Sequence, residues 1–342
     1  MFSERTATRD TELEFGDEAS IPADEMPSCS GSSPHLNASQ VTDASPQTRQ
    51  SGFAAGLAAY FIWGFLPLYL LLVREVPAFE FVGWRIIWTL PICLLIVAVR
   101  KQGPQICAAL FNRRVLVTLA ASATLIGSNW FVYVWAIQQD QVYAASLGYY
   151  INPLLNVLLG TFLLGERLSR RQWVAVAIAA CGVALLLGGA LTTLWISLAL
   201  AITFGVYGLL RKQVDVGALP GLTIESALLV VPAGAIAWWY AASPAGSSFG
   251  QSIELSLAIV LGGILTAIPL LLFAIAARRM DYSTLGFLQF LAPTIVFILG
   301  LTVFDQPLQP VQLACFVLIW IAIAIFVWDI LARRQADKVL QA

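Results

Sequence analysis

The stretch SLGYYINPLLNVLLGTFLLGERLSRRQW, residues 146–173, returns in diluted form as TLGFLQFLAPTIVFILGLTVFDQPLQPVQL, residues 284–313. An offset of 140 positions places Pro153 on Pro293. The first copy ends in the basic segment GERLSRRQ, whereas the second copy ends in FDQPLQPVQ and contains no arginine. A repeated motif that loses its positive charge in one copy indicates that the two copies end in different surroundings.

The composition places the chain in a lipid bilayer. Of the 342 residues, 59% are hydrophobic and 11% are charged, which lies outside the range of water-soluble domains. A helix needs roughly 20 apolar residues to cross about 30 Å of hydrocarbon, and helices satisfy the backbone of such segments in lipid. We predict ten membrane helices, at residues 53–72, 79–99, 114–137, 142–163, 171–189, 192–210, 219–241, 255–276, 282–303 and 310–331.

Basic residues gather in every second loop of this arrangement. Because cytoplasmic loops retain Lys and Arg, both termini are predicted to be cytoplasmic. The helix at 142–163 then ends on the cytoplasmic side and the helix at 282–303 ends on the opposite side, which explains the missing arginines. The opposite loops offer only Arg74. The cytoplasmic loops and tail contain Arg100, Lys101, Arg113, Arg114, Arg167, Arg170, Arg171, Arg211, Lys212, Arg278, Arg279, Arg333, Arg334 and Lys338.

Two copies that face opposite ways predict an inverted repeat. An odd number of helices in each copy inverts the second copy automatically, and five plus five accounts for all ten. We therefore predict an all-α polytopic membrane protein with ten transmembrane helices as two inverted five-helix repeats, residues 52–190 and 191–332. Secondary transporters use this architecture and hold their substrate near the midplane, where the two halves meet.

The two ends of the chain are polar. Residues 1–50 contain nine acidic residues against three arginines, cannot bury a core, and are predicted to form a disordered acidic cytoplasmic tail. Residues 333–342 are predicted to form a cytoplasmic C-terminal tail. The single histidine, His35, lies in the N-terminal tail, and the five cysteines lack CxxC spacing. We therefore predict no metal site, no cofactor and no catalytic residue.

Motifs in six of the predicted helices recur in the order of a known transporter family. They read AAYFIWGFLPLYL, EFVGWRIIW, IGSNWFVYVWA, ASLGYYINPLLNVLLGTFLLGERL, TIESALLVVPA and STLGFLQFLAPT. Over residues 52–331 the chain resembles the RarD branch of the EamA family, in the drug/metabolite transporter superfamily. The resemblance implies two inverted five-helix repeats in the bacterial inner membrane and a link to chloramphenicol sensitivity, but it identifies no substrate. Trp84 precedes Arg85 where the family pattern has a histidine, so a proton-handling role of that histidine cannot be carried over.

Charged residues within the predicted helices are the first candidates for function. A cation in hydrocarbon is costly unless it is paired or wetted, so Arg85 is predicted to contact substrate or a carboxylate, or to snorkel to the outer interface over Trp88. Glu225 is the proton-coupling candidate, with Glu80 as its approximate equivalent in the first repeat. The alternative is that both carboxylates are interfacial residues at helix ends. Glu166 is interpreted as a structural or gating residue.

In several predicted membrane helices, polar or aromatic side chains lie close to a proline. Pro153 and Pro293 cannot donate a hydrogen bond to the carbonyl four residues earlier, and such freed backbone is typical of helices that line a cavity. The alternatives are hydrogen bonding between helices, and aromatic anchoring or packing. An aromatic, lightly polar pocket would suit an amphipathic organic solute. The substrate-cavity candidates are Tyr60, Trp63, Arg85, Asn129, Tyr133, Tyr149, Asn152, Asn156 and Gln289.

The leading hypothesis is a secondary transporter, not an enzyme, that exports a small organic solute across the inner membrane by alternating access. The chain has no GxxxxGK[ST] stretch, so an ion gradient or the solute's own gradient would supply the energy. The alternatives are an uptake permease, a membrane-embedded sensor or accessory subunit, and an intramembrane enzyme, for which no paired-Asp motif is present. The expected partners are a small-molecule solute and the lipid bilayer but no nucleic acid; protons and a homodimer are left open.

Overall fold

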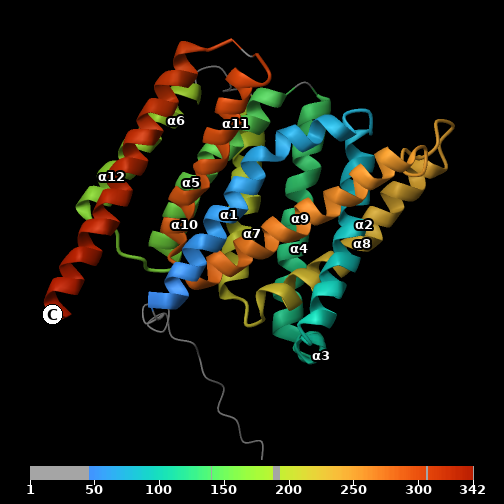
Figure 1. Ribbon diagram of the computed structural model, residues 1–342, viewed down its shortest axis with the longest axis horizontal. Coiled ribbons are helices and arrows are strands. Elements are labelled where there is room, and N and C mark those ends of the chain that lie inside the picture. Colours follow the sequence, from blue (N-terminus) through green and yellow to red (C-terminus); the bar gives the residue numbers. More distant parts are fainter. Residues whose placement is uncertain (1–45, 140, 188–192, 306, 342) are drawn as a thin grey trace, which may run out of the picture.

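Every regular element that the structure describes is a helix. The computed structural model describes residues 46–139, 141–187, 193–305 and 307–341, and Figure 1 shows its helices as a bundle that runs between an upper and a lower end. Most of the predicted N-terminal tail, residues 1–45, lies outside the described residues. The helices are α1 (Pro46–Leu70), η2 (Leu71–Val73), α2 (Ala78–Val99), α3 (Gly103–Phe111), α4 (Arg113–Gln138), α5 (Val142–Leu163), α6 (Arg170–Leu187), α7 (Leu194–Gln213), α8 (Ala218–Ala241), α9 (Ile253–Arg279), α10 (Tyr282–Gln289), α11 (Leu291–Thr302) and α12 (Pro310–Gln341).

The helices confirm an all-α, multi-pass membrane protein. Within the described residues, eight segments are long and apolar enough to cross a membrane; one of them is formed by α10 and α11 together. The other long helices are α5 and α6, with 22 and 18 residues. The ten crossings and their inversion stay a prediction.

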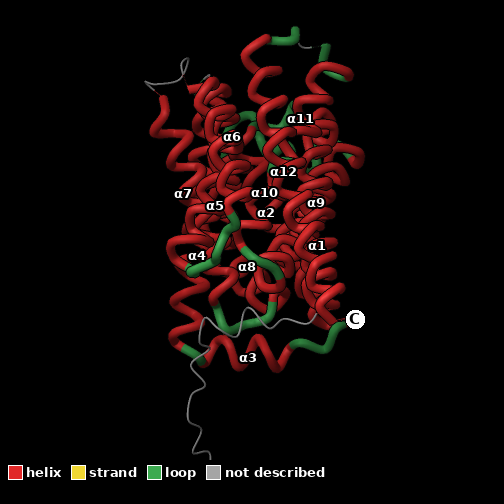
Figure 2. The backbone as a smooth tube through the Cα atoms, turned by 90° about the vertical axis from the view of Figure 1, so that its left-hand side faces the viewer, coloured by secondary structure: helices red, strands yellow, loops and turns green. Residues whose placement is uncertain are grey.

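The structure differs from the predicted helices in several places. The predicted cytoplasmic loop after α2 contains the short helix α3, which lies across the lower end of the molecule (Figure 2). The predicted helix at 282–303 is interrupted at Phe290, because Pro293 lacks the amide that would bond the carbonyl of Gln289. By contrast, α5 continues through Pro153, so the loss of the same hydrogen bond does not interrupt the helix in that copy.

Most of the main helix contacts recur when the first five long helices are exchanged for the last five. The contact of α1 with α9 corresponds to that of α4 with α7, and the contact of α2 with α9 corresponds to that of α4 with α8. Likewise α5 contacts α7 as α11 contacts α1. Three pairs are their own counterparts: α2 with α8, α6 with α12, and α5 with α10. In Figure 1, α6 and α12 form one edge of the bundle, and α2 and α8 lie toward the opposite edge.

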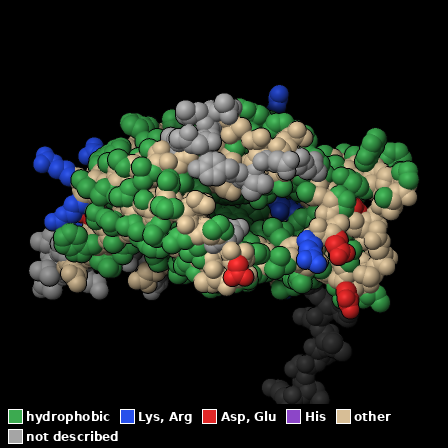
Figure 3. All heavy atoms as spheres, turned by 90° about the horizontal axis from the view of Figure 1, so that it is seen from above, with side chains coloured by type: hydrophobic (Ala, Val, Ile, Leu, Met, Phe, Trp, Pro, Cys, Tyr) green, Lys and Arg blue, Asp and Glu red, His purple; other side chains and the backbone are tan. Residues whose placement is uncertain are grey.

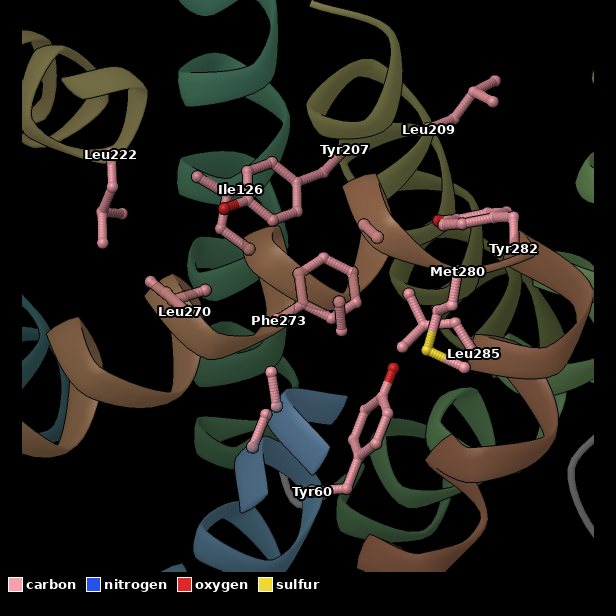
Figure 4. Packing of buried hydrophobic residues seen from close by; sticks show 14 of the residues in the cluster. Tyr60, Ile126, Tyr207, Leu209, Leu222, Leu270, Phe273, Met280, Tyr282 and Leu285 are labelled. Atoms are coloured by element: carbon pink, nitrogen blue, oxygen red, sulfur yellow. The ribbon is translucent and has the colours of Figure 1, made fainter. Parts of the chain in front are cut away.

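An aromatic core fills the centre of the bundle. Tyr60 of α1, Tyr207 of α7, Phe273 of α9 and Tyr282 of α10 are each at most 1% exposed and pack in one cluster (Figure 4). The rings of Tyr207 and Phe273 stack with centroids 6.1 Å apart, and the Tyr282 hydroxyl donates to the carbonyl of Gly205 over 2.7 Å. Aromatic pairs add about 0.5–1.5 kcal/mol each beyond the area that they bury, so this cluster holds α1, α7, α9 and α10 together.

Candidate functional site

The upper end of the molecule is hollowed, and a basic side chain is visible in the hollow (Figure 3). Arg85 lies seven residues inside α2, which begins at this end with Ala78. At 1.5 Å per residue this is a depth of about 10 Å. Its guanidinium carbon lies 4.4 Å from the ring centroid of Trp130, which comes from α4. The side chain therefore reaches across to α4 instead of following its own helix to the interface.

Tyrosines surround this arginine. Tyr69, Tyr133 and Tyr149 all lie within its electrostatic reach. The rings of Tyr133 and Tyr149 meet edge to face, with centroids 5.7 Å apart, and Tyr149 is 46% exposed. Arginine stacked on tryptophan is a favourable cation–π contact. Trp130 and Tyr133 of α4 and Tyr149 of α5 therefore place aromatic side chains next to the cation.

Arg85 has no carboxylate partner among the residues that the structure describes. Its Nε is buried and makes no hydrogen bond in these ranges. Glu80, on the same helix, is engaged elsewhere: it accepts hydrogen bonds from Ser247 Oγ (2.6 Å), and from the backbone amide and the hydroxyl of Ser248 (both 2.7 Å). Trp88 packs on Phe249, with ring centroids 5.8 Å apart, and the ring that the guanidinium contacts is that of Trp130.

Trp130 separates the hollow from a small internal cavity. The cavity has a volume of about 10 Å³, which is room for about one water molecule. It is lined by Ile86, Thr89, Ile126, Trp130, Tyr207, Leu222, Glu225, Ser226, Leu229 and Leu270. One tryptophan thus contacts Arg85 and also faces the cavity that holds Glu225.

Glu225 is fully enclosed and paired with an arginine. Its Oε1 accepts a hydrogen bond from Ser122 of α4 and lies 3.6 Å from Nη1 of Arg211. Arg211 is 0% exposed and donates from Nη2 to the carbonyl of Ala218 over 2.7 Å. A side chain at Gly221 would overlap the guanidinium, so glycine is required there. Arg211 was predicted to be a loop residue; that was wrong, because the last turn of α7 directs it into the bundle.

A second set of charged groups joins helix ends at the lower end. Glu166 accepts hydrogen bonds from the amide of Tyr282 (2.6 Å) and from the amide and hydroxyl of Ser283 (2.8 and 2.6 Å). A carboxylate at the first turn of α10 is favoured by the helix dipole. Lys212 Nζ lies 4.0 Å from Glu166 and donates to the carbonyls of Ala277 (3.1 Å) and Met280 (2.6 Å), at the end of α9. We call Glu166, Lys212 and the α9–α10 turn the lower latch.

The motif GERLSRRQ builds this latch. Gly165 has φ of +68°, a conformation that glycine adopts readily, and it turns the chain after α5. The amide of Ser169 donates to the side chain of Gln172 over 2.8 Å, and the amide of Gln172 donates to the Ser169 hydroxyl over 3.0 Å. This reciprocal capping box starts α6 and so fixes Glu166 between two helices.

The remaining cavity candidates are buried in helix contacts. Asn129 donates to the carbonyl of Leu200 (2.8 Å) and to Thr203 (2.9 Å) of α7. Asn156 donates to Gln289 over 2.7 Å and thereby joins α5 to α10. Asn152 is also buried, and its Oδ1 has no hydrogen-bond partner among the described residues.

The aromatic candidates of α1 differ in exposure. Tyr60 belongs to the closed aromatic core, whereas Trp63 is half-buried next to it, with ring centroids 5.6 Å apart. The structure therefore brings Arg85, Tyr133 and Tyr149 together, and it distributes the other candidates over helix interfaces and the core.

Comparison with known proteins identifies the family. An uncharacterized transporter of Pseudomonas aeruginosa is 42% identical over 278 residues, which cover 81% of this chain and 93% of that protein. Protein RarD of Escherichia coli is 40% identical over 301 residues, covering 85% of this chain and 99% of that protein. The EamA-like transporter family matches residues 50–188. The chain belongs to the RarD branch of the EamA family.

Membership of the EamA family confirms the resemblance seen in the sequence. The chain is a transporter of the drug/metabolite type, a multi-pass protein of the inner membrane that acts on a small molecule. A solved crystal structure superposes with a TM-score of 0.65 at 21% identity, covering 81% of this chain and 97% of that chain. At that identity the likeness supports the fold alone.

Three important residues of this EamA protein were missed in the sequence. Trp130 stood in a quoted motif but was not a candidate, since its partner Arg85 lies on another helix. Arg211 and Lys212 were counted among cytoplasmic loop charges. The signal that could have singled out Arg211 is a carboxylate buried in the next helix, Glu225, which needs a cation nearby.

Proposed function

We propose that this EamA-family protein is a secondary transporter that exports a small organic solute across the bacterial inner membrane by alternating access. The observation that carries the proposal is that the upper end is hollowed (Figure 3), whereas at the lower end Glu166 and Lys212 join the connection after α5 to α7, α9 and α10. Alternating access requires a site that opens to one side at a time, and contacts that join helix ends on the other side are expected in such a state.

The packing of the helices supports two related halves. Most of the main contacts recur when helices of the first half are exchanged for those of the second, which supports two inverted five-helix repeats at 52–190 and 191–332. Rocking of such repeats against each other is the expected motion. The lower end contains α3, the start of α1 and the end of α12 (Figures 1 and 2). Basic residues lie on both sides of α3 and at the end of α12. The positive-inside rule therefore supports a cytoplasmic lower end and a periplasmic hollow.

Glu225 is the group that we propose for proton coupling. A proton on Glu225 would cancel its charge and leave Arg211 without its partner, which would loosen the contact of α7 with α8. In proteoliposomes, Glu225→Gln should abolish the effect of a proton gradient on flux, while Glu254→Gln, at an exposed position of α9, should not. Undiminished proton-driven flux in folded Glu225→Gln protein would remove this residue from the mechanism.

The direction of transport is tested by untargeted metabolite profiling of cells and medium. A deletion strain is compared with the same strain expressing the protein. Export predicts a compound that moves from the cytoplasm to the medium with expression. Depletion of a medium component with accumulation inside would identify an uptake permease instead, and no change in either pool would favour a sensor or accessory protein.

A further inference from the structure

Arg85 differs from the other buried cations of the bundle. Arg211 lies 3.6 Å from Glu225, and Lys212 lies 4.0 Å from Glu166. Arg85 has no carboxylate within ion-pair distance among the described residues; its buried Nε donates no hydrogen bond there, which is also true of the Nε of Arg211. An uncompensated cation inside a membrane protein is costly. The cation–π contact with Trp130 is weaker than an ion pair and offsets only part of that cost. The hollow therefore presents a positive charge that an anion from outside the chain would neutralise.

The surroundings of Arg85 limit the kind of anion. The guanidinium has a planar fork of donors that matches a carboxylate. The connection from α1 to α2 contains another basic residue, Arg74, but it is exposed to solvent. Arg85 alone therefore compensates one negative charge, and a second would stay uncompensated. Trp130, Tyr133 and Tyr149 offer aromatic surface beside the cation, and aromatic surface favours an apolar body.

We infer that Arg85 is the anion-binding residue of the solute site, and that the solute is a monoanion: a carboxylate joined to an apolar or aromatic body. The identity of this ligand as a transported solute rests on the proposed function, but its binding can be measured without transport. The phosphate of an anionic lipid headgroup is also a monoanionic oxyanion and could bind Arg85 in the same way. The experiment therefore distinguishes a soluble carboxylate from a lipid headgroup.

The first test uses iodide, a monoanion that quenches tryptophan fluorescence on contact. The protein is placed in nanodiscs of phosphatidylcholine, and the signal of Trp130 is isolated by subtracting the Trp130→Phe variant. Wild-type protein should show saturable quenching, and Arg85→Gln should raise the half-saturating iodide concentration about tenfold or more, as the loss of a charge-assisted contact predicts. Arg85→Lys should retain part of the effect. The matched control Arg74→Gln should behave as wild type, and quenching by neutral acrylamide should be the same in all variants.

The second test competes iodide with matched probes that share one aromatic body. The carboxylate 3-phenylpropionate should displace iodide, whereas 3-phenylpropionamide and 3-phenylpropylamine should not. Quenching that does not depend on Arg85 would overturn the anion site. Displacement by the amide, or none by the carboxylate, would overturn the assigned ligand class. If phosphatidylglycerol in the nanodisc displaces iodide and the carboxylate does not, a lipid headgroup occupies the site and the solute assignment fails.

These results are independent of the proposed function. If the carboxylate binds as expected but profiling finds no transported compound, the transport proposal fails and the site stands. If profiling identifies a neutral or cationic solute whose flux persists in Arg85→Gln, the inference fails and the transport proposal stands.

Discussion

Positions 85 and 225 occupy the same place in two helices that pack against each other, yet one carries a cation and the other a carboxylate. Each lies seven residues after its helix begins, at Ala78 of α2 and Ala218 of α8, and the two positions are related by the 140-residue offset of the repeat. The sequence had suggested Glu80 as the counterpart of Glu225; the helix bounds assign that place to Arg85.

The two positions differ in how their charge is compensated. Glu225 has Arg211 and Ser122 within the protein, whereas Arg85 has aromatic neighbours and no carboxylate among the described residues. A charge compensated by the fold contributes to the structure, and a charge left without a counterion is available to a ligand. Substitutions at the two positions and in the neighbouring contacts test this distinction.

Removing the carboxylate of Glu225 should destabilise the protein most. In Glu225→Gln, Arg211 is left buried without its counterion, and breaking such a pair costs about 3–5 kcal/mol of the free energy of unfolding. SDS titration of the purified protein, followed by circular dichroism, measures the change. Glu254→Gln, at an exposed position, is the control. The double substitution Arg211→Met with Glu225→Leu should recover much of the loss, and a double variant as unstable as the single one would contradict the assigned role of the pair.

Loosening the lower latch should have the next largest effect. Glu166→Gln keeps the shape of the side chain but weakens three hydrogen bonds to Tyr282 and Ser283; hydrogen bonds to a charged group are worth about 1.5–3 kcal/mol. Amide exchange in peptides that cover residues 277–290 should become faster, while exchange in α2 should not change. Equal exchange rates in wild type and Glu166→Gln would show that this carboxylate does not hold the lower end closed.

The hydrogen bond between Asn156 and Gln289 should contribute less. Gln289→Leu removes the partner of a buried neutral amide and should cost about 1 kcal/mol. Adding Asn156→Leu also removes the buried amide that Gln289→Leu leaves without a partner, and this should return the free energy of unfolding toward the wild-type value. The same SDS titration measures both variants; strict additivity of the two losses would mean that the amides act separately.

Arg85→Gln should change the free energy of unfolding least. Because the fold supplies no carboxylate to Arg85, the loss should stay below about 0.5 kcal/mol, or stability should rise, as is common when a binding residue is removed. A loss comparable to that of Glu225→Gln would mean that Arg85 has a structural partner, and the distinction between the two positions would disappear.

The sequence predicted the helices better than the contacts between them. Length and hydropathy located α5 at Val142–Leu163, the bounds that were expected, because a membrane helix needs only its own residues to satisfy its backbone. The interruption at Phe290 and the continuity of α5 could not be separated in advance, since Pro153 and Pro293 remove the same hydrogen bond. The neighbours of each helix decide whether it breaks.

The candidate site was predicted in part. Arg85, Tyr133 and Tyr149 do lie together, but the arginine's contact with Trp130 joins two helices and has no signature in either one. Arg211 followed an apolar run, as cytoplasmic loop arginines do, and the positive-inside pattern cannot distinguish a side chain that faces water from one that turns inward toward Glu225.

Cysteine labelling tests most directly whether the site is open at the upper end and sealed at the lower end. Tyr149→Cys and Ser283→Cys are each introduced into protein whose native cysteines are replaced by serine, and a membrane-impermeant maleimide is applied to intact spheroplasts and to inverted vesicles. Position 149 should be labelled from the periplasmic side. Position 283 should be protected from both sides until Glu166→Gln is added, after which it should be labelled from the cytoplasmic side. Labelling of position 283 from the cytoplasm in the presence of Glu166, with position 149 protected, would contradict this arrangement.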